Sequence, residues 1–162
     1  IVLSPIAASA ATDSTTVTAN VASVISVSSA DTATISVTPD GDGEVGTAID
    51  TVTVNSNDPD GFNLSLENDS TLTMTGVPGG TIAKTSGTFG SPAALGANSW
   101  GYRITGFAAD TYAGLEDAAQ QIKTTSAVAT NDQTVVTYGV NVNTATPAGA
   151  YSDSVTYTAT AK

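Results

Sequence analysis

Acidic side chains gather in two turn-like segments whose spacing could hold a calcium ion. Asp40, Asp42 and Glu44 occupy alternate positions of PDGDGE, and Asp58 and Asp60 occupy alternate positions of NDPDG. Ca²⁺ prefers hard carboxylate oxygens of this kind, although the spacing does not follow the EF-hand pattern. Calcium is therefore a candidate cofactor, and the plainer alternative is a pair of solvated turns in which Asp bonds to the backbone.

The chain contains no Cys and no His. Their absence removes thiol chemistry, imidazole acid–base catalysis and the usual zinc ligands. No other nucleophile stands beside a base in a recognisable constellation. We therefore expect a protein that is not an enzyme and that has no resident cofactor apart from the calcium candidate.

Two asparagines lie in short N-x-S sequences that could accept an N-linked sugar. They are Asn63 in NLS and Asn68 in NDS. The motif is short and arises often by chance. Both are candidate glycosylation sites that an intact mass would test.

The aromatic residues allow two interpretations. Trp100, Tyr102, Tyr138, Tyr151 and Tyr157 could form a platform on which a sugar stacks. They all stand on segments with strand-like alternation, however, and packing in a core or an interface is the more common use of such side chains. Packing is the expectation, and a host or surface glycan remains an alternative partner.

Composition limits the class of protein. The 162 residues suit one domain with an extension, and 15 acidic against 4 basic groups give a formal charge of −11. Such a charge repels nucleic acid, and no apolar run approaches the length of a membrane span. Abundant Thr and Ser favour exposed β-structure, which is typical of a secreted or cell-surface protein.

Alternation with period two predicts that nearly every segment after residue 14 is a strand. Glycine, proline, asparagine and aspartate clusters separate these segments at intervals of roughly ten residues, as in a β-sandwich. We expect an all-β, antiparallel sandwich, Ig-like or jelly-roll-like, with at most one short helix at 112–123. The predicted strand faces are, in chain order, Thr15–Ser28; Ala33, Ile35 and Val37; Val52 and Val54; Phe62, Leu64 and Leu66; Leu72 and Met74; Trp100, Tyr102 and Ile104; Val136, Tyr138, Val140 and Val142; Val155, Tyr157, Ala159 and Ala161.

The first ten residues, IVLSPIAASA, form an uncharged and largely apolar tail. Ala8–Ala10 fits the small-residue pattern of a signal-peptide cleavage site. An apolar tail that is kept needs cover, so we expect it to dock in a groove of a neighbouring copy or, alternatively, of its own domain. We assign residues 1–16 to an extension and 17–162 to one sandwich domain. The candidate docking residues are Ile1, Val2, Leu3, Ile6, Val17 and Val21.

Two stretches resemble known families. PAGAYSDSVTYT at 147–158 resembles the P-x-G-x-Y-x-D-x-V-x-V-x ending of spore-coat-U-like and chaperone-usher-type pilus subunits. GFNLSL at 61–66 and SWGYRI at 99–104 are similar to Thr-rich secreted surface proteins of bacteria. In the pilus families an N-terminal extension completes the sandwich of the next subunit, although those subunits often carry a disulfide, which this chain lacks.

These observations together predict a structural subunit of an extracellular filament or pilus. Identical subunits would join head to tail by donor-strand complementation, because an added strand supplies a hydrogen-bond ladder and buried side chains. Such heterologous contacts propagate into fibres. The alternatives are a monomeric cell-surface adhesion or carbohydrate-binding module, and an S-layer or virion coat protein.

Overall fold

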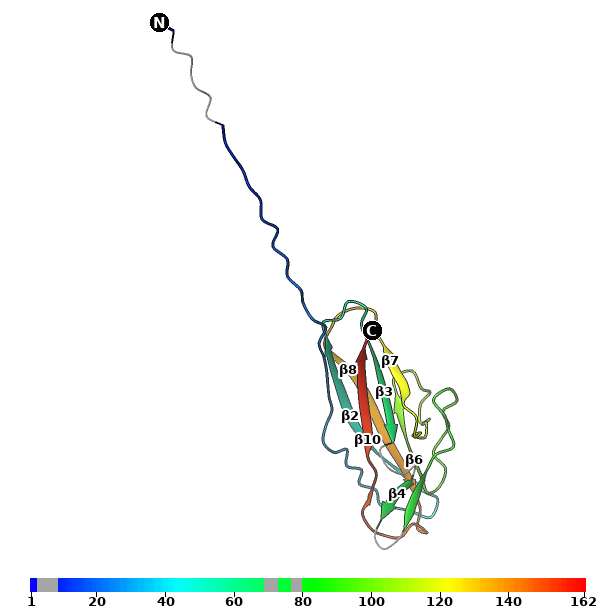
Figure 1. Cartoon of the computed structure of the whole chain (residues 1–162). Helices are drawn as coiled ribbons and strands as arrows, with labels where there is room; N and C mark the ends of the chain where they lie inside the picture. The colour runs from blue at the N-terminus through cyan, green and yellow to red at the C-terminus, as the bar shows by residue number, and fades with distance from the viewer. Residues whose placement is uncertain (3–8, 69–72, 77–79) are drawn as a thin grey trace.

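The computed structural model describes residues 1–2, 9–68, 73–76 and 80–162, and the protein consists of a β-structured body with a long extended tail (Figure 1). The described residues form ten strands and no helix. Among them, accordingly, no helix is suited to crossing a membrane. The strands lie in two sheets, so the fold is all-β and sandwich-like, as the alternation predicts.

The larger sheet has seven strands in the order β1-β2-β8-β6-β5-β4-β9. All its neighbours are antiparallel except β5 and β6, which are parallel, so the prediction of a purely antiparallel sheet is wrong at that pair. A parallel pair needs a long crossover, and the 85–98 segment between β5 and β6 provides it. The strands are β1 (Ile25–Ser28), β2 (Glu44–Ser56), β8 (Ala129–Val142), β6 (Ser99–Ile104), β5 (Thr81–Lys84), β4 (Thr73–Gly76) and β9 (Tyr151–Ser152).

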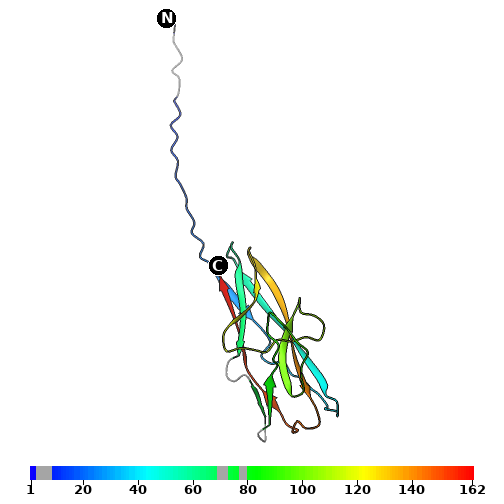
Figure 2. The same cartoon turned by 90° about the vertical axis from the view of Figure 1, so that its right-hand side faces the viewer.

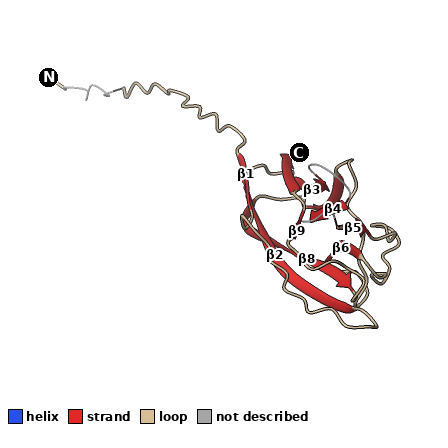
Figure 3. Cartoon of the chain, turned by 90° about the horizontal axis from the view of Figure 1, so that it is seen from below, coloured by secondary structure: helices blue, strands red, loops and turns tan. Residues whose placement is uncertain are grey.

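The smaller sheet has three antiparallel strands in the order β10-β3-β7. They are β10 (Val155–Ala161), β3 (Phe62–Asn68) and β7 (Gln120–Thr124). Seen from below, β3 of this sheet lies across the body from β2 and β8 (Figure 3). Among the described strands, β10 is hydrogen-bonded to β3 alone.

The core lies between the two sheets and follows the predicted strand faces. Val52 and Val54 of β2 are fully buried, as are Phe62 and Leu64 of β3. The alternation on β8 is also confirmed, because its predicted face is buried throughout. The buried residues of that face are Val136, Tyr138, Val140 and Val142.

The predicted helix at 112–123 is wrong. Tyr112 and Ala113 are buried and form isolated bridges with Ala93 and Tyr102. Ala118 and Ala119, which helical spacing assigns to the core, are exposed, and the segment ends in strand β7. A helix of three turns is marginal by itself, so pairing with neighbouring chain overrides the local periodicity.

Two predicted strands are shorter or less regular than their alternation suggests. Of the segment 15–28 only β1 is a strand, and the segment with Ala33, Ile35 and Val37 is extended but has no ladder. The reason is the same in both places: a strand exists only where a second chain segment pairs with it. Leu72 and the predicted turns at 69–70 and 77–79 lie outside the described residues.

The tail leaves the body at the end where the C-terminus lies, and it runs straight away from the sheets in two perpendicular views (Figures 1 and 2). It continues the direction of β1, which pairs with the last residues of β2. The loop that precedes β9 lies at the opposite end of the body (Figure 1). Tail and loop are therefore separated by the length of the sandwich.

Candidate functional site

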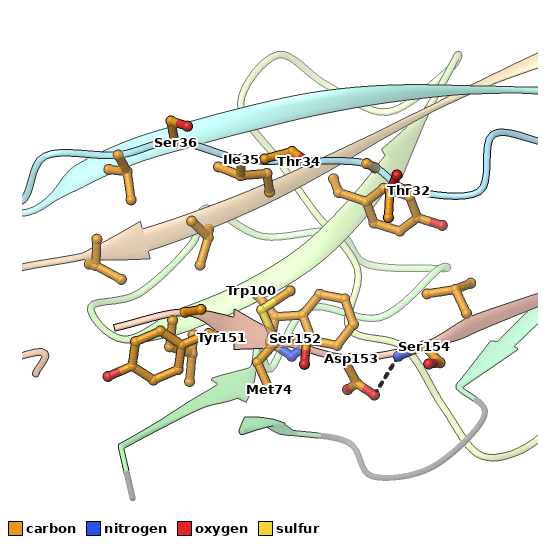
Figure 4. A pocket seen from close by; sticks show the side chains of 18 of the residues that line it. Thr32, Thr34, Ile35, Ser36, Met74, Trp100, Tyr151, Ser152, Asp153 and Ser154 are labelled. Atoms are coloured by element: carbon orange, nitrogen blue, oxygen red, sulfur yellow. Dashed lines mark hydrogen bonds between the residues drawn. The ribbon is translucent and has the colours of Figure 1, made fainter. Parts of the chain in front are cut away.

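An open groove of about 850 Å³ runs between two segments of chain at one side of the body (Figure 4). One wall is Ser29–Val37, which follows β1, and the other is Thr146–Val155, which contains β9. We call these the first wall and the second wall. In Figure 4 the labelled side chains Thr32, Thr34, Ile35 and Ser36 of the first wall lie across the groove from Tyr151–Ser154 of the second.

The first wall has the side-chain pattern of a strand and the backbone of a free edge. Ile35 and Val37 are half-buried against the core, while Thr34 and Ser36 are exposed. Their approach depends on Gly46 of β2, because a Cβ there would lie 2.7 Å from Ile35 Cγ2. Within the described part of the chain, no hydrogen bond from the backbone of residues 31–38 is found. This backbone is therefore available to another strand.

The second wall is paired on one side. Its β9 bonds to β4, and no other strand of the described chain lies on its other side. The Tyr151 hydroxyl donates to the Pro147 carbonyl at 2.6 Å, which fixes the loop before β9. Asn68 Nδ2 donates to Asp153 Oδ2 at 2.9 Å and so holds the wall to β3. A strand placed between the walls would thus meet a free edge on each side.

The floor of the groove is apolar. Side chains from four strands of the large sheet form it, with the indole of Trp100 among them. Among the residues that the structure describes, Trp100 Nε1 finds no hydrogen-bond partner. An apolar floor between two backbone edges suits an extended peptide with alternating apolar side chains. The floor can bury the apolar side chains of the peptide, and the edges can form hydrogen bonds with its backbone. The floor residues are Met74, Ile82, Trp100, Val140 and Val142.

A polar group joins the two sheets where they line the groove. The hydroxyls of Tyr138 on β8 and Tyr157 on β10 are hydrogen-bonded at 2.6 Å. Burial raises the pKa of both tyrosines, with the nearby Asp50 carboxylate acting in the same direction. Asp50 is itself buried and accepts the backbone N–H of Ala30 at 3.0 Å, so the group also holds the start of the first wall.

The aromatic residues are placed as packing predicts. Trp100 and Tyr102 are each 1% exposed, Tyr138 is buried, and Tyr151 and Tyr157 are half-buried. Burial raises the pKa of Tyr102 to about 12, with a smaller contribution from the Glu116 charge. A sugar platform needs exposed ring faces, so this arrangement favours packing.

The tail is exposed along its described length. Val17 is 89% exposed and Val21 is 85% exposed, and Ile1 and Val2 are fully open to solvent. The other two candidate docking residues, Leu3 and Ile6, lie outside the described residues. Residues 9–21 do not dock on their own domain, since they extend away from the body (Figure 2).

The last three residues of the tail are held by the turn that follows β2. Val24 N–H donates to Asn57 Oδ1 at 2.7 Å, Asn57 N–H donates to the Val24 carbonyl at 3.2 Å, and Asn57 Nδ2 donates to the Ala22 carbonyl at 2.9 Å. Ser23 Oγ donates to Asp58 Oδ2 at 3.0 Å. We call residues 22–24 the root of the tail. These bonds extend the pairing of β1 with β2 by side-chain contacts and set the direction in which the chain departs.

The acidic residues proposed for calcium are not brought together. The turn with Asp40 and Asp42 precedes β2 and the turn with Asp58 and Asp60 follows it, so the 13 residues of β2 separate them by about 40 Å. Asp40 Oδ1 accepts the N–H groups of Asp42 and Gly43, and Asp58 Oδ1 accepts that of Asp60. Glu44 begins β2 and is exposed. Within residues 1–2, 9–68, 73–76 and 80–162, no three carboxylates form a group that could hold a metal.

The two sequon asparagines differ in accessibility. Asn63 is half-exposed, and its Oδ1 accepts the Thr124 hydroxyl at 2.8 Å. Asn68 is 7% exposed, and its Nδ2 is the donor to Asp153. A sugar on Asn68 Nδ2 would replace that bond and separate the second wall from β3, so Asn63 is the better acceptor of the two.

Sequence reasoning missed the root contacts and the tyrosine pair. Asn57 belongs to the NDPDG turn, where its usual role is to bond within the turn, and nothing in its spacing points to residues 22–24. Tyr138 and Tyr157 were each placed correctly on a strand face, but which strands oppose one another across the two sheets depends on topology. A groove of some kind was expected, because the apolar tail is predicted from the sequence to dock in one.

The chain was compared with family models, with curated proteins and with solved structures, and it matches none of them.

Proposed function

We propose that the protein is a subunit of an extracellular filament, in which the tail of one copy enters the groove of the next copy as an additional strand. The observation that carries the proposal is the pairing of an exposed, strand-like tail with a groove that has a free backbone edge on each side. In an isolated molecule the tail and the groove both leave backbone groups unpaired, which invites pairing with another chain. A tail inserted in the groove would pair the backbone groups of both.

The tail fits the groove in pattern and in length. Val17, Ala19 and Val21 alternate with Thr16, Thr18 and Asn20, so an inserted strand would turn apolar side chains to the floor and polar ones to solvent. The seven residues of 15–21 span about 23 Å when extended, and the eight residues of 30–37 on the first wall span about 26 Å. The strand would therefore run along most of the wall.

The root of the tail favours a second copy over the tail's own groove. A hairpin centred on Ser23 would place Val21 opposite Ile25 and Val17 opposite Ser29, so the apolar stretch would end where the groove begins. Residues 9–16, SAATDSTT, would then lie beside the first wall, and they offer only small side chains and a carboxylate. The same hairpin would break the bonds from the root to Asn57 and Asp58.

Joining of this kind gives a thread and not a closed dimer. The tail leaves from one end of the body and the second wall lies towards the other (Figure 1), so donor and acceptor surfaces differ and the contact is heterologous. The scarcity of lysine, with only three in the chain, leaves the sheet edges without the charges that usually block strand addition. Secretion and display on a cell surface remain part of the proposal.

The test adds two negative charges either to the apolar face of the tail or to its polar face. The variant with Val17→Asp and Val21→Asp should remain monomeric, because carboxylates would have to be buried on the apolar floor. The matched control carries Thr18→Asp and Asn20→Asp, which adds the same charge on the solvent face and should still form filaments. Negative-stain micrographs and light scattering after size exclusion measure the outcome.

A second arm removes the tail. Deletion of residues 1–21 retains the root and should leave monomers, to which a synthetic peptide of residues 9–24 should bind. Trp100 is the single tryptophan of the chain and lies in the groove floor, so its emission reports binding at the intended place. Filaments that persist after the deletion would refute the proposal, and wild-type chains that stay monomeric would favour the adhesion module.

A further inference from the structure

The tail is attached to the body by several hydrogen bonds at its root. A flexible linker gains nothing from ordered attachment, and its residues usually move independently of the domain. Here all three root residues are hydrogen-bonded to one turn, through the side chains of Asn57 and Asp58 and through the backbone N–H of Asn57.

The turn that holds the root is itself fixed. Asp58 is 8% exposed, and while its Oδ2 receives the Ser23 hydroxyl, its Oδ1 accepts the Asp60 N–H at 3.0 Å. The Asp58 N–H donates to Ser56 Oγ at 3.2 Å, and its carbonyl accepts the Gly61 N–H at 3.1 Å. Because Gly61 has a φ of +88° and lies against Thr125, the turn is also packed against the chain after β7.

We infer that Asn57 and Asp58 form a stiff joint, which holds the donor strand of one subunit in line with its own body and so fixes the angle between successive subunits. The inference rests on the proposed function. The donor stretch ends at Val21, and the root begins at the next residue, so no free linker separates the docked strand from the joint. Rigidity at the root therefore passes directly to the neighbouring subunit.

The joint has no role in the docking contact itself. Asn57 and Asp58 do not line the groove, and the side chains proposed to enter the groove lie outside the root. Loosening the joint should therefore preserve assembly and change only the shape of the assembly. This separation makes the joint testable apart from strand addition.

The test variant carries Ser23→Ala and Asn57→Ala in the full chain. These changes remove the side-chain bonds to the root, while Asp58 keeps its bonds within the turn. The control carries Ser26→Ala and Asn55→Ala on β1 and β2. It removes a comparable bond, because Asn55 Oδ1 accepts the Asn131 N–H at 2.8 Å, but it leaves the root intact.

Two measurements decide the outcome. In micrographs the variant should form filaments whose persistence length is at least about twofold shorter than that of wild type and control. By hydrogen exchange and mass spectrometry the Val24 amide should exchange about tenfold faster in the variant only. Variant filaments of unchanged stiffness would overturn the joint alone, whereas wild-type chains that form no filament would overturn the proposed function and the joint with it.

Discussion

Removal of one hydroxyl, by Tyr157→Phe, tests how the two sheets are held together at the groove. The Tyr157 hydroxyl bonds to that of Tyr138 at 2.6 Å, and the two residues belong to different sheets. Phenylalanine keeps the ring and its packing, so the change isolates the polar contact.

The expected cost follows from what is left behind. A hydrogen bond contributes about 0.5–1.5 kcal/mol net, and a buried group that loses its partner costs about 1–3 kcal/mol. Tyr138 is 7% exposed and would lose its hydroxyl partner. We therefore expect the free energy of unfolding to fall by about 1–2 kcal/mol at pH 7. Tyr151→Phe is the control, because it removes a hydroxyl bond within one exposed loop and should cost less than about 1 kcal/mol.

The difference between wild type and variant should depend on pH. Burial raises the pKa of Tyr157 in the folded protein above the ordinary value of 10.0, so above pH 10 the unfolded chain loses this proton and the folded chain keeps it. The stability that the tyrosine contributes is therefore complete below pH 10 and is lost as the pH rises beyond it. At pH 11 the loss amounts to about 1.4 kcal/mol, which the phenylalanine variant does not share. The two proteins should be nearly equal in stability there.

Urea denaturation at pH 7, 9, 10 and 11, followed by circular dichroism, measures these values directly. A double variant with Tyr138→Phe completes a mutant cycle and should give a coupling energy of about 0.5–1.5 kcal/mol. An advantage of wild type that stays constant from pH 8 to pH 11 would refute the reasoning on burial. A coupling energy near zero would refute the contact.

Three further predictions concern packing, the first wall and metal. Gly101→Ala should lower the free energy of unfolding by about 1–3 kcal/mol in urea denaturation, because the new Cβ would lie 2.5 Å from the Ala113 carbonyl oxygen; a neutral change would contradict the packing at β6. Gly46→Ala should displace the first wall from β2 and weaken the binding of a peptide of residues 9–24 about tenfold in a calorimetric titration, and unchanged affinity would argue against the wall as a binding edge. An excess of chelator should shift the melting temperature by less than about 1 °C, since the Asp40 and Asp58 carboxylates already accept backbone N–H groups; a fall of several degrees that calcium restores would reinstate the metal.

Side-chain alternation was sufficient to predict most of the body. Phe62, Leu64 and Leu66, and the four residues from Val136 to Val142 that face the core, were placed on the correct side before any pairing was known. Each such strand is buried on one face only, so period two survives in its sequence. The parallel pairing of β5 with β6 leaves no such signature, because it depends on the path of the chain between them.

The wrong helix and the missing strands have one physical origin, which is that pairing between distant segments of the chain cannot be read from local periodicity. At 112–123 the spacing of Leu115, Ala118, Ala119 and Ile122 suits a helix, yet Gly114 lies so close to the Thr85 carbonyl that a Cβ would come within 2.5 Å of it. Tight approach of two backbones is a tertiary fact that periodicity cannot report. The segments 15–24 and 31–38 fail in the opposite sense, because their sequences are those of strands but no strand of the described chain pairs with them.

The same two segments explain why the candidate site could be predicted only in part. The strand-like pattern of the tail can be recognised from Val17 and Val21, and the expectation that the tail docks follows from its apolar residues. The groove that would receive it combines Trp100, Ile35 and Tyr151 from distant parts of the chain, and no local pattern unites them.

The placement of tail and second wall at opposite ends of the body gives any thread of such subunits a polarity (Figure 1). One end of the thread would present an empty groove and the other end an undocked tail. Growth and its termination would therefore depend on different surfaces at the two ends. A truncated copy could be received at one terminus and would offer nothing to its successor, which makes it a chain terminator for growth in a single direction.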